Sequence, residues 1–149
     1  MTFVEFDKLL SMEKSFLNLK KVILPGEQDF KVYDVASLTT QDLFLLDYDR
    51  RGKFELKHKK QLRHGKDMLM VRMEINAPKH TNPDGKTISR NHIHIFKEGY
   101  EPGRLPWAYE LCDIFPNLDY ERLAPLGIFS HFCKFCNIGL HGVTLQGVI

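Results

Sequence analysis

Two histidines separated by one residue are the most suggestive pair for chemistry in this 149-residue sequence. A strand over Asn91 to Phe96 would place His92 and His94 on one face and the isoleucines on the other, because side chains alternate along a strand. Same-face neighbours on a strand are roughly 6.5 Å apart, so the two imidazoles can converge on one metal ion. The alternative is a half-buried strand whose histidines face solvent.

Two cysteines three positions apart, Cys133 and Cys136, form a second candidate pair. This Cys-x-x-Cys spacing lets two thiolates share one tetrahedral Zn²⁺ ion. Two other interpretations stay open. The cysteines fall on a helical stripe with Phe129 and Phe132, so they can be small core residues, and they can also be a redox pair. A thioredoxin-type redox pair begins a helix after a strand, whereas this pair ends a predicted helix.

The two pairs complement each other, because each provides half of a Cys₂His₂ zinc site. A fifth candidate, His80, lies in the turn-rich segment before the histidine strand and can replace Cys133. We therefore predict one structural Zn²⁺ held by four of five residues: His80, His92, His94, Cys133 and Cys136. Such a closed site would join the C-terminal helix to the sheet. The sequence patterns of catalytic zinc enzymes do not accompany it.

The same histidines permit an enzymatic alternative, a small endoribonuclease toxin. His80, His92 and His94 lie near lysines and an arginine in the sequence, so they can supply the acid, base and phosphate clamp of metal-independent RNA cleavage. The histidines cannot be both zinc ligands and free acid–base groups, so metal analysis separates the two interpretations. We expect a protein that is not an enzyme.

The segment from Arg50 to Lys66 is the most polar stretch of the chain and forms a local basic stripe. It is either a solvated sheet face or a contact surface for a phosphate backbone or an acidic partner. The binding residues predicted for such a surface are Lys57, Lys59, Lys60 and Arg63. The whole chain has 21 basic and 19 acidic residues, a formal net charge of +2, which favours neither direct DNA binding nor imitation of DNA.

Length and composition fit one globular domain over residues 1–149, since 43% of the residues are hydrophobic and can form a core without disulfides. Three cysteines, an odd number, are not the framework of a secreted disulfide protein. We recognise neither a signal peptide nor an apolar run long enough to span a membrane. We therefore expect a cytoplasmic protein of a bacterial host with no membrane partner.

Periodicity predicts the elements that position these residues. An amphipathic helix runs from Thr2 to about Lys20, with Thr2 and Glu5 as a capping box. Short strand-like runs separated by Gly and Pro follow at Val22–Leu24, Phe30–Val35, Leu43–Asp49, Lys53–Lys59, Met68–Ile75 and Asn91–Phe96. Helical segments return at Trp107–Leu111 and from Leu118 to about Cys136, with Asn117 as cap and Gly139 as stop.

The predicted strands lack intervening helices, so the sheet should be mainly antiparallel and curved, with about five or six strands. The turn-rich segment from Pro78 to Gly85 should join two neighbouring strands. The predicted fold class is therefore α+β. The N-terminal helix and the C-terminal helices should pack on one side of the sheet, stapled by the zinc site.

Several motifs resemble an uncharacterised family of small proteins from Gram-positive bacteria and their prophages. They are His80-Thr-Asn-Pro-Asp-Gly85, Asn91-His-Ile-His-Ile-Phe-Lys-Glu-Gly-Tyr100, Trp107-Ala108 and Phe135-Cys-Asn-Ile138. The resemblance covers most of the chain and is looser in the N-terminal helix. It marks four residues as the family's recurring polar cluster, namely His80, His92, His94 and Cys136.

Small size and a His/Cys metal site also resemble the zinc-containing anti-CRISPR proteins of phages, which inhibit type II Cas9 effectors. This resemblance implies a protein–protein inhibitor from a mobile element, whose partner is Cas9 or its guide-RNA complex. The near-neutral charge favours binding to a non-catalytic lobe, which would block nucleic-acid loading or rearrangement. A host regulatory binding module is a third alternative, beside the ribonuclease toxin.

Overall fold

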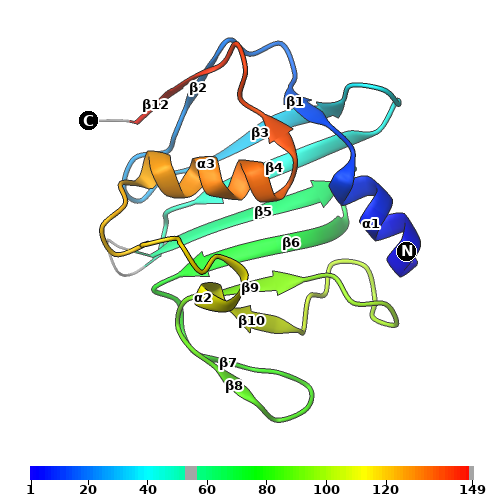
Figure 1. The fold of residues 1–149 in the computed structure, drawn as a ribbon, viewed down its shortest axis with the longest axis vertical. Coiled ribbons are helices and arrows are strands. Elements are labelled where there is room, and N and C mark those ends of the chain that lie inside the picture. Colours follow the sequence, from blue (N-terminus) through cyan, green and yellow to red (C-terminus); the bar gives the residue numbers. More distant parts are fainter. Residues whose placement is uncertain (53–56, 148–149) are drawn as a thin grey trace.

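A curved β-sheet dominates the computed structural model, which describes residues 1–52 and 57–147 (Figure 1). Within these residues the main sheet has eight strands, in the order β10-β9-β6-β5-β4-β3-β1-β11. Their bounds are β1 Lys14–Phe16, β3 Phe30–Ser37, β4 Leu43–Asp49, β5 His58–His64, β6 Met68–Ile75, β9 His92–Ile95, β10 Ala108–Glu110 and β11 Ile138–Gly139. All neighbours pair antiparallel except β1 and β11, which are parallel. The α+β class and the mainly antiparallel sheet are confirmed, with more strands than predicted.

Two short strand pairs and three helices complete the described structure. The pairs are β2 (Lys21–Ile23) with β12 (Thr144–Gln146), and β7 (His80–Thr81) with β8 (Thr87–Ile88). The turn-rich segment from Pro78 to Gly85 lies between the neighbouring strands β6 and β9, as predicted, but it also contains β7, which pairs with β8. The helices are α1 (Phe3–Ser11), α2 (Leu111–Ile114) and α3 (Pro125–Phe135). Among the described residues, no helix combines the length and apolar character needed to cross a membrane.

The N-terminal helix starts as predicted and ends earlier. Thr2 and Glu5 form a capping box, in which the Thr2 side chain accepts from the Glu5 backbone N–H and Glu5 accepts from the Thr2 N–H. The helix ends at Ser11, and Lys14–Phe16 becomes β1 because it pairs with β3 on one side and β11 on the other. The predicted extension to Lys20 is therefore wrong, since pairing between distant strands overrides the local helical pattern.

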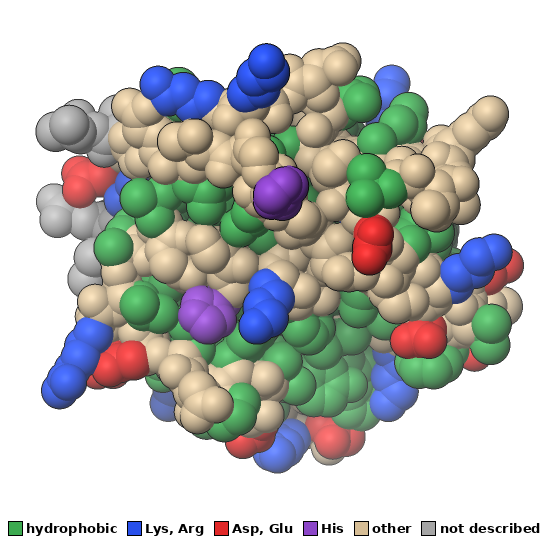
Figure 2. Space-filling model, turned by 45° about the horizontal axis from the view of Figure 1, so that its top comes forward, with side chains coloured by type: hydrophobic (Ala, Val, Ile, Leu, Met, Phe, Trp, Pro, Cys, Tyr) green, Lys and Arg blue, Asp and Glu red, His purple; other side chains and the backbone are tan. Residues whose placement is uncertain are grey.

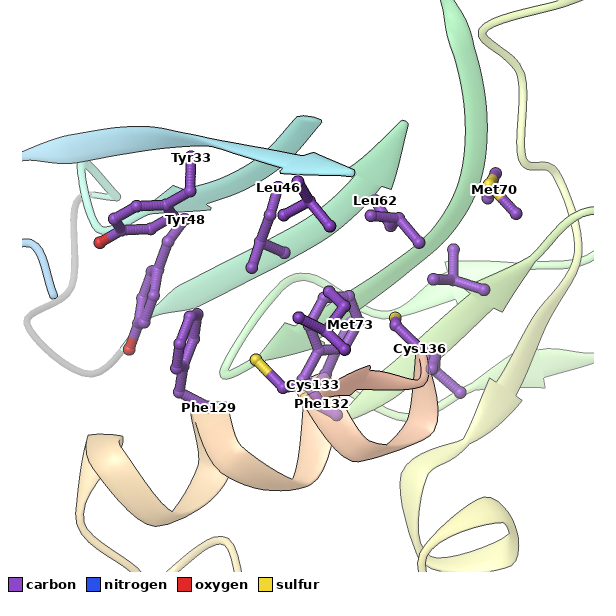
Figure 3. Close-up of a cluster of buried hydrophobic side chains, with 14 of the residues drawn as sticks. Tyr33, Leu46, Tyr48, Leu62, Met70, Met73, Phe129, Phe132, Cys133 and Cys136 are labelled. Atoms are coloured by element: carbon purple, nitrogen blue, oxygen red, sulfur yellow. The ribbon is translucent and has the colours of Figure 1, made fainter. Parts of the chain in front are cut away.

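One face of the sheet and the helix α3 enclose the hydrophobic core (Figures 1 and 3). Phe129 and Phe132 of α3 are fully buried, and the Phe129 ring stacks on Tyr48 of β4 with ring centres 5.7 Å apart. Proline at the first helical position begins α3, because its missing N–H needs no intrahelical partner there. The other face of the sheet carries the polar residues of the central strands.

The C-terminal helices differ from the sequence-based expectation. Residues 108–110 form β10 instead of a helix, because they pair antiparallel with β9. The long helix begins at Pro125 instead of Leu118, with Ala124 rather than Asn117 as its cap. The helix ends at Phe135. Asn137, with a φ of 56°, adopts the left-handed conformation that was expected of Gly139 as the stop signal.

The predicted strand Lys53–Lys59 falls partly outside the described residues, because residues 53–56 are not described. The observed strand β5 runs from His58 to His64, where a turn through Gly65, with a φ of 60°, leads into β6. Along β5, His58, Lys60 and Leu62 are buried and alternate with more exposed residues. This alternation decides which basic side chains reach the surface.

Candidate metal centre

The register between β6 and β9 brings four polar residues to one face of the sheet. Glu74 lies directly opposite His92, and Arg72 lies directly opposite His94. Opposite residues in an antiparallel pair share a face, so these side chains form one group. The two histidines share a face, as the two-residue strand period predicted. Ile93 pairs with Met73 on the core face.

Both histidines turn the same ring nitrogen toward one carboxylate oxygen. The Nε2 atoms of His92 and His94 each lie 3.0 Å from Oε2 of Glu74. Their Nδ1 atoms lie 2.6 Å from the Ser89 carbonyl oxygen and 2.7 Å from the Leu105 carbonyl oxygen, respectively. The histidine side chains are only 1% and 2% exposed, so water does not compete for these contacts.

If both histidines are neutral, this arrangement has fewer N–H donors than oxygen acceptors facing the rings. A neutral imidazole carries one N–H, yet each ring has oxygen acceptors at both nitrogens. Two imidazolium rings would provide enough protons, but they would join Arg72 in placing three positive charges around one carboxylate. A cation between the Nε2 atoms and Glu74 removes this conflict, because neutral rings then donate from Nδ1 and coordinate from Nε2.

The charged groups shift one another's proton affinity. Burial opposes ionisation of Glu74, but hydrogen bonds with His92 and His94 outweigh it and hold the pKa of Glu74 well below its usual range. Burial also disfavours charge on the histidines. It lowers the pKa of His94. For His92 burial is also the largest single effect, but the hydrogen bonds with Glu74 and the Ser89 carbonyl, together with the Glu74 charge, outweigh it and raise the pKa. The site therefore contains an ionised carboxylate between two dissimilar imidazoles.

Glu74, His92 and His94 can hold a metal ion, since one ligand atom from each lies within 4.8 Å of the others. Tetrahedral zinc with bonds of about 2.0–2.1 Å separates its ligand atoms by roughly 3.3 Å. The observed 3.0 Å contacts need to open by only a few tenths of an ångström. Backbone carbonyls that accept from Nδ1 are a usual support for metal-binding histidines, because they fix the ring and its tautomer.

His80 lies beside this group without joining it. Its ring centre is 4.7 Å from that of His94 and 6.0 Å from that of His92. Its Nε2 lies 2.7 Å from the Pro106 carbonyl oxygen, so this nitrogen is directed away from the carboxylate. The hairpin that carries His80 is anchored through Asn82, which exchanges two hydrogen bonds with the backbone of Ala108.

The structure does not bring the cysteines to the histidines. Cys133 on α3 and Cys136 at its C-cap are fully buried, and Figure 3 shows them among Phe132 and Met73 in the hydrophobic core. The pairing of Met73 with Ile93 places this core on the opposite face of the sheet from the imidazoles. The predicted Cys₂His₂ set is therefore corrected, because the sheet separates the two pairs. Burial raises the pKa of the Cys133 thiol to about 12, so a reactive thiolate is disfavoured.

The four basic residues predicted for a binding surface do not share one surface. Lys60 is fully buried on the core face, where its Nζ lies 4.4 Å from the centre of the Tyr48 ring. Arg63 is paired with Asp47, with 2.7 Å between Nε and Oδ2. Lys57 and Lys59 line one surface hollow. Figure 2 shows charged side chains of both signs scattered over the face in view, without a large patch of one sign.

Glu74 is a candidate ligand that is not among the five residues predicted from the sequence. The run Met68–Ile75 is apolar except for Arg72 and Glu74, which alternate with apolar residues near its end. Such an alternation in an otherwise hydrophobic strand indicates a face that needs polar partners. Pairing this run with the histidine strand would have placed the carboxylate opposite an imidazole.

A family assignment follows from the comparison with known families. Residues 1–138 match the model of a family described as "Family of unknown function (DUF6978)". The chain belongs to this family. The match includes every residue of the candidate metal centre, so the group lies within the DUF6978 region. No curated protein and no solved structure gave a significant match.

Proposed function

We propose that this DUF6978 protein binds one Zn²⁺ ion through Glu74, His92 and His94. The ion would stabilise the fold of a non-enzymatic protein that binds a partner. The observation that carries the proposal is the convergence of two buried Nε2 atoms on one carboxylate oxygen, while both Nδ1 atoms face backbone carbonyls. Two histidines and one carboxylate are a ligand set that zinc uses. The same set also binds iron(II), but nitrogen and oxygen ligands generally hold zinc more tightly.

The ion would join three segments of the chain. Glu74 belongs to β6, and the two imidazoles belong to β9. Through their Nδ1 atoms the imidazoles hold Ser89, just before β9, and Leu105, just before β10. Because metal binds the folded chain and the ligands are dispersed in the unfolded chain, its binding free energy adds to stability. The proposed role is therefore structural support of this end of the sheet.

The ribonuclease alternative places different demands on the same residues. An acid–base pair needs ring nitrogens that can reach the substrate. Here the side chains of His92 and His94 are 1% and 2% exposed, and all four ring nitrogens already face oxygen atoms. These contacts favour metal binding. RNA cleavage that survives a chelator and disappears in His92→Ala would reverse this preference.

The expectation of a Cas9 inhibitor rests on the resemblance alone and stays a proposal. It requires a protein partner, namely a type II Cas9 effector or its guide-RNA complex. Co-purification of the chain with tagged Cas9 and guide RNA tests it. Stable capture together with loss of target cleavage would support the proposal, and absence of both would remove it while leaving the metal site untouched.

Elemental analysis tests the metal proposal. Protein purified without an affinity metal or a chelator should contain about one zinc ion per chain. Glu74→Gln keeps the shape of the side chain but loses its charge, so this variant should lose the zinc. Cys133→Ala removes only a buried thiol and is the matched control that should keep it. Wild-type protein without stoichiometric metal, including after incubation with zinc, would contradict the proposal.

A further inference from the structure

Arg72 presents an unsatisfied hydrogen-bond donor next to the metal centre. Its Nε is buried and has no hydrogen-bond partner in the part of the chain that the structure describes. The nearest anionic atom is Oε2 of Glu74 at 3.8 Å, which is beyond hydrogen-bond distance. On the same sheet face, Arg63 binds both carboxylate oxygens of Asp47 at 2.7 Å. The Nε of Arg63 therefore has a carboxylate acceptor, whereas the Nε of Arg72 on the same face has none among the described residues.

A zinc ion held by these three residues would have one open coordination position. Three protein ligands leave one position of a tetrahedral zinc ion for water or another small ligand. The side chains of Glu74 and Arg72 are 16% and 24% exposed, whereas those of His92 and His94 are almost fully buried. Solvent therefore reaches this group from the side of Glu74 and Arg72, and a fourth ligand that enters there would meet the unpaired Nε.

The charges around a bound divalent ion would favour an anion. A divalent ion and Arg72 contribute three positive charges, the histidines are neutral as ligands, and Glu74 contributes one negative charge. Glu110, whose carboxylate also interacts electrostatically with His92, already accepts two hydrogen bonds from Ser89. The excess of two positive charges matches a phosphate dianion better than a singly charged carboxylate. Oxygen ligands of one phosphate group can also reach a metal ion and a guanidinium together.

We propose that the site binds the phosphate group of a small molecule, with one oxygen on the metal ion and another accepting a hydrogen bond from Arg72 Nε. This inference rests on the proposed metal site and adds its ligand class. Two sources share this chemistry, namely free inorganic phosphate and a phosphate monoester. The group would complete the coordination of the ion and satisfy Arg72 at the same time.

Cobalt substitution tests the inference. Protein loaded with one Co²⁺ per chain is titrated with inorganic phosphate, with adenosine 5′-monophosphate and with acetate, and the visible absorption of the bound cobalt is recorded. We expect a saturable spectral change with at least one of the phosphates, and a much weaker response to acetate. Arg72→Gln should retain cobalt and bind phosphate at least tenfold more weakly, whereas Arg63→Gln should bind it like the wild type. A tighter response to the monophosphate than to inorganic phosphate identifies an ester as the ligand, and the reverse identifies free phosphate.

The outcomes separate the two proposals. If the wild type does not bind cobalt or zinc, the metal proposal fails. If cobalt binds but its spectrum ignores both phosphates, or if Arg72→Gln responds like the wild type, only the phosphate inference fails. Acetate binding as tightly as phosphate would also overturn it. A spectrum that responds to phosphate only in His80→Ala would show that His80 occupies the fourth position, which contradicts the inference for the native chain.

Discussion

Glu74 on β6 and His92 on β9 are direct partners in an antiparallel pair, and their side chains meet at 3.0 Å on the sheet face opposite the core. A shift of the register by one residue would turn one of these side chains toward the core. The candidate metal centre is thus a consequence of strand register, and its candidate ligands come from strands that a hairpin with β7 and β8 separates in the sequence.

Removing a ligand should act on stability only when metal is present. We expect zinc to raise the melting temperature of the wild type and to leave that of His94→Ala unchanged, because binding stabilises only a chain that holds the ion. At a free metal concentration about 100 times the dissociation constant, the wild-type gain is about 2.7 kcal/mol. Differential scanning fluorimetry with and without chelator measures it. Cys112→Ser, at an exposed cysteine, should respond like the wild type.

The sequence was sufficient for the parts of the fold that depend on local patterns. The capping box at Thr2, the strands Leu43–Asp49 and Met68–Ile75 and the shared face of the two histidines all follow from alternation or from capping chemistry. The short strands β1, β10 and β11 were missed, because three or fewer residues carry little periodicity of their own. They become strands only through partners far away in the sequence.

The candidate site could be predicted only in part, because the rest of it depends on pairing between strands that are distant in the sequence. His92 and His94 were found from spacing, but their partner Glu74 depends on which strands are neighbours. The cysteine pair lies on the opposite side of the sheet from the histidines, and a Cys-x-x-Cys spacing describes a metal pair and a buried helical stripe equally well. Sequence spacing alone cannot decide which face of a sheet a distant helix covers.

Lys60→Met should stabilise the protein. Burial lowers the pKa of Lys60 to about 7, and its Nζ has no hydrogen-bond partner among the described residues. Above the ordinary lysine pKa the amine is neutral in both states. As the pH falls toward 7, the unfolded chain binds the proton and the folded chain does not, so the penalty grows and stays constant below pH 7. We expect a gain of about 2–4 kcal/mol near neutral pH that shrinks as the pH rises toward 10.

Urea unfolding of Lys60→Met and the wild type at several pH values measures this difference. Lys59→Met is the matched control, because Lys59 is adjacent to Lys60 on the strand and lies on the opposite, more exposed face. This control should change the free energy of unfolding by less than about 1 kcal/mol at every pH. A loss of stability in Lys60→Met would show that the buried amine makes a stabilising interaction, which contradicts this prediction.

Lys14→Met should have the opposite effect. Lys14 is also buried, but its Nζ donates to the carbonyl oxygens of Leu10, Met12 and Cys136 at 2.8, 3.0 and 2.8 Å. The substitution leaves these carbonyls without their donor and breaks the link between the ends of α1 and α3. We expect a loss of about 2–4 kcal/mol in the free energy of unfolding. Equal stability of the variant and the wild type in urea would contradict this account of the ammonium group.

Asn82→Ala should loosen the hairpin that carries His80. The Asn82 amide donates to the Ala108 carbonyl at 2.9 Å and accepts from the Ala108 N–H at 2.8 Å, and its side chain is buried. Losing both bonds should cost about 1–3 kcal/mol and increase amide hydrogen exchange in β7 and β8. Asp84→Ala at the exposed hairpin tip is the control and should change both quantities little. Unchanged exchange in Asn82→Ala would show that the hairpin is held elsewhere.

X-ray absorption spectroscopy at the zinc edge tests the central claim most directly, because it distinguishes nitrogen and oxygen ligands from sulfur. For zinc-loaded wild-type protein we predict a first shell of nitrogen and oxygen atoms at about 2.0–2.1 Å, with imidazole scattering from two histidines. The shell should contain no sulfur and should be unchanged in Cys133→Ala. A sulfur shell at about 2.3 Å would contradict the Glu74–His92–His94 site and restore the cysteines as ligands.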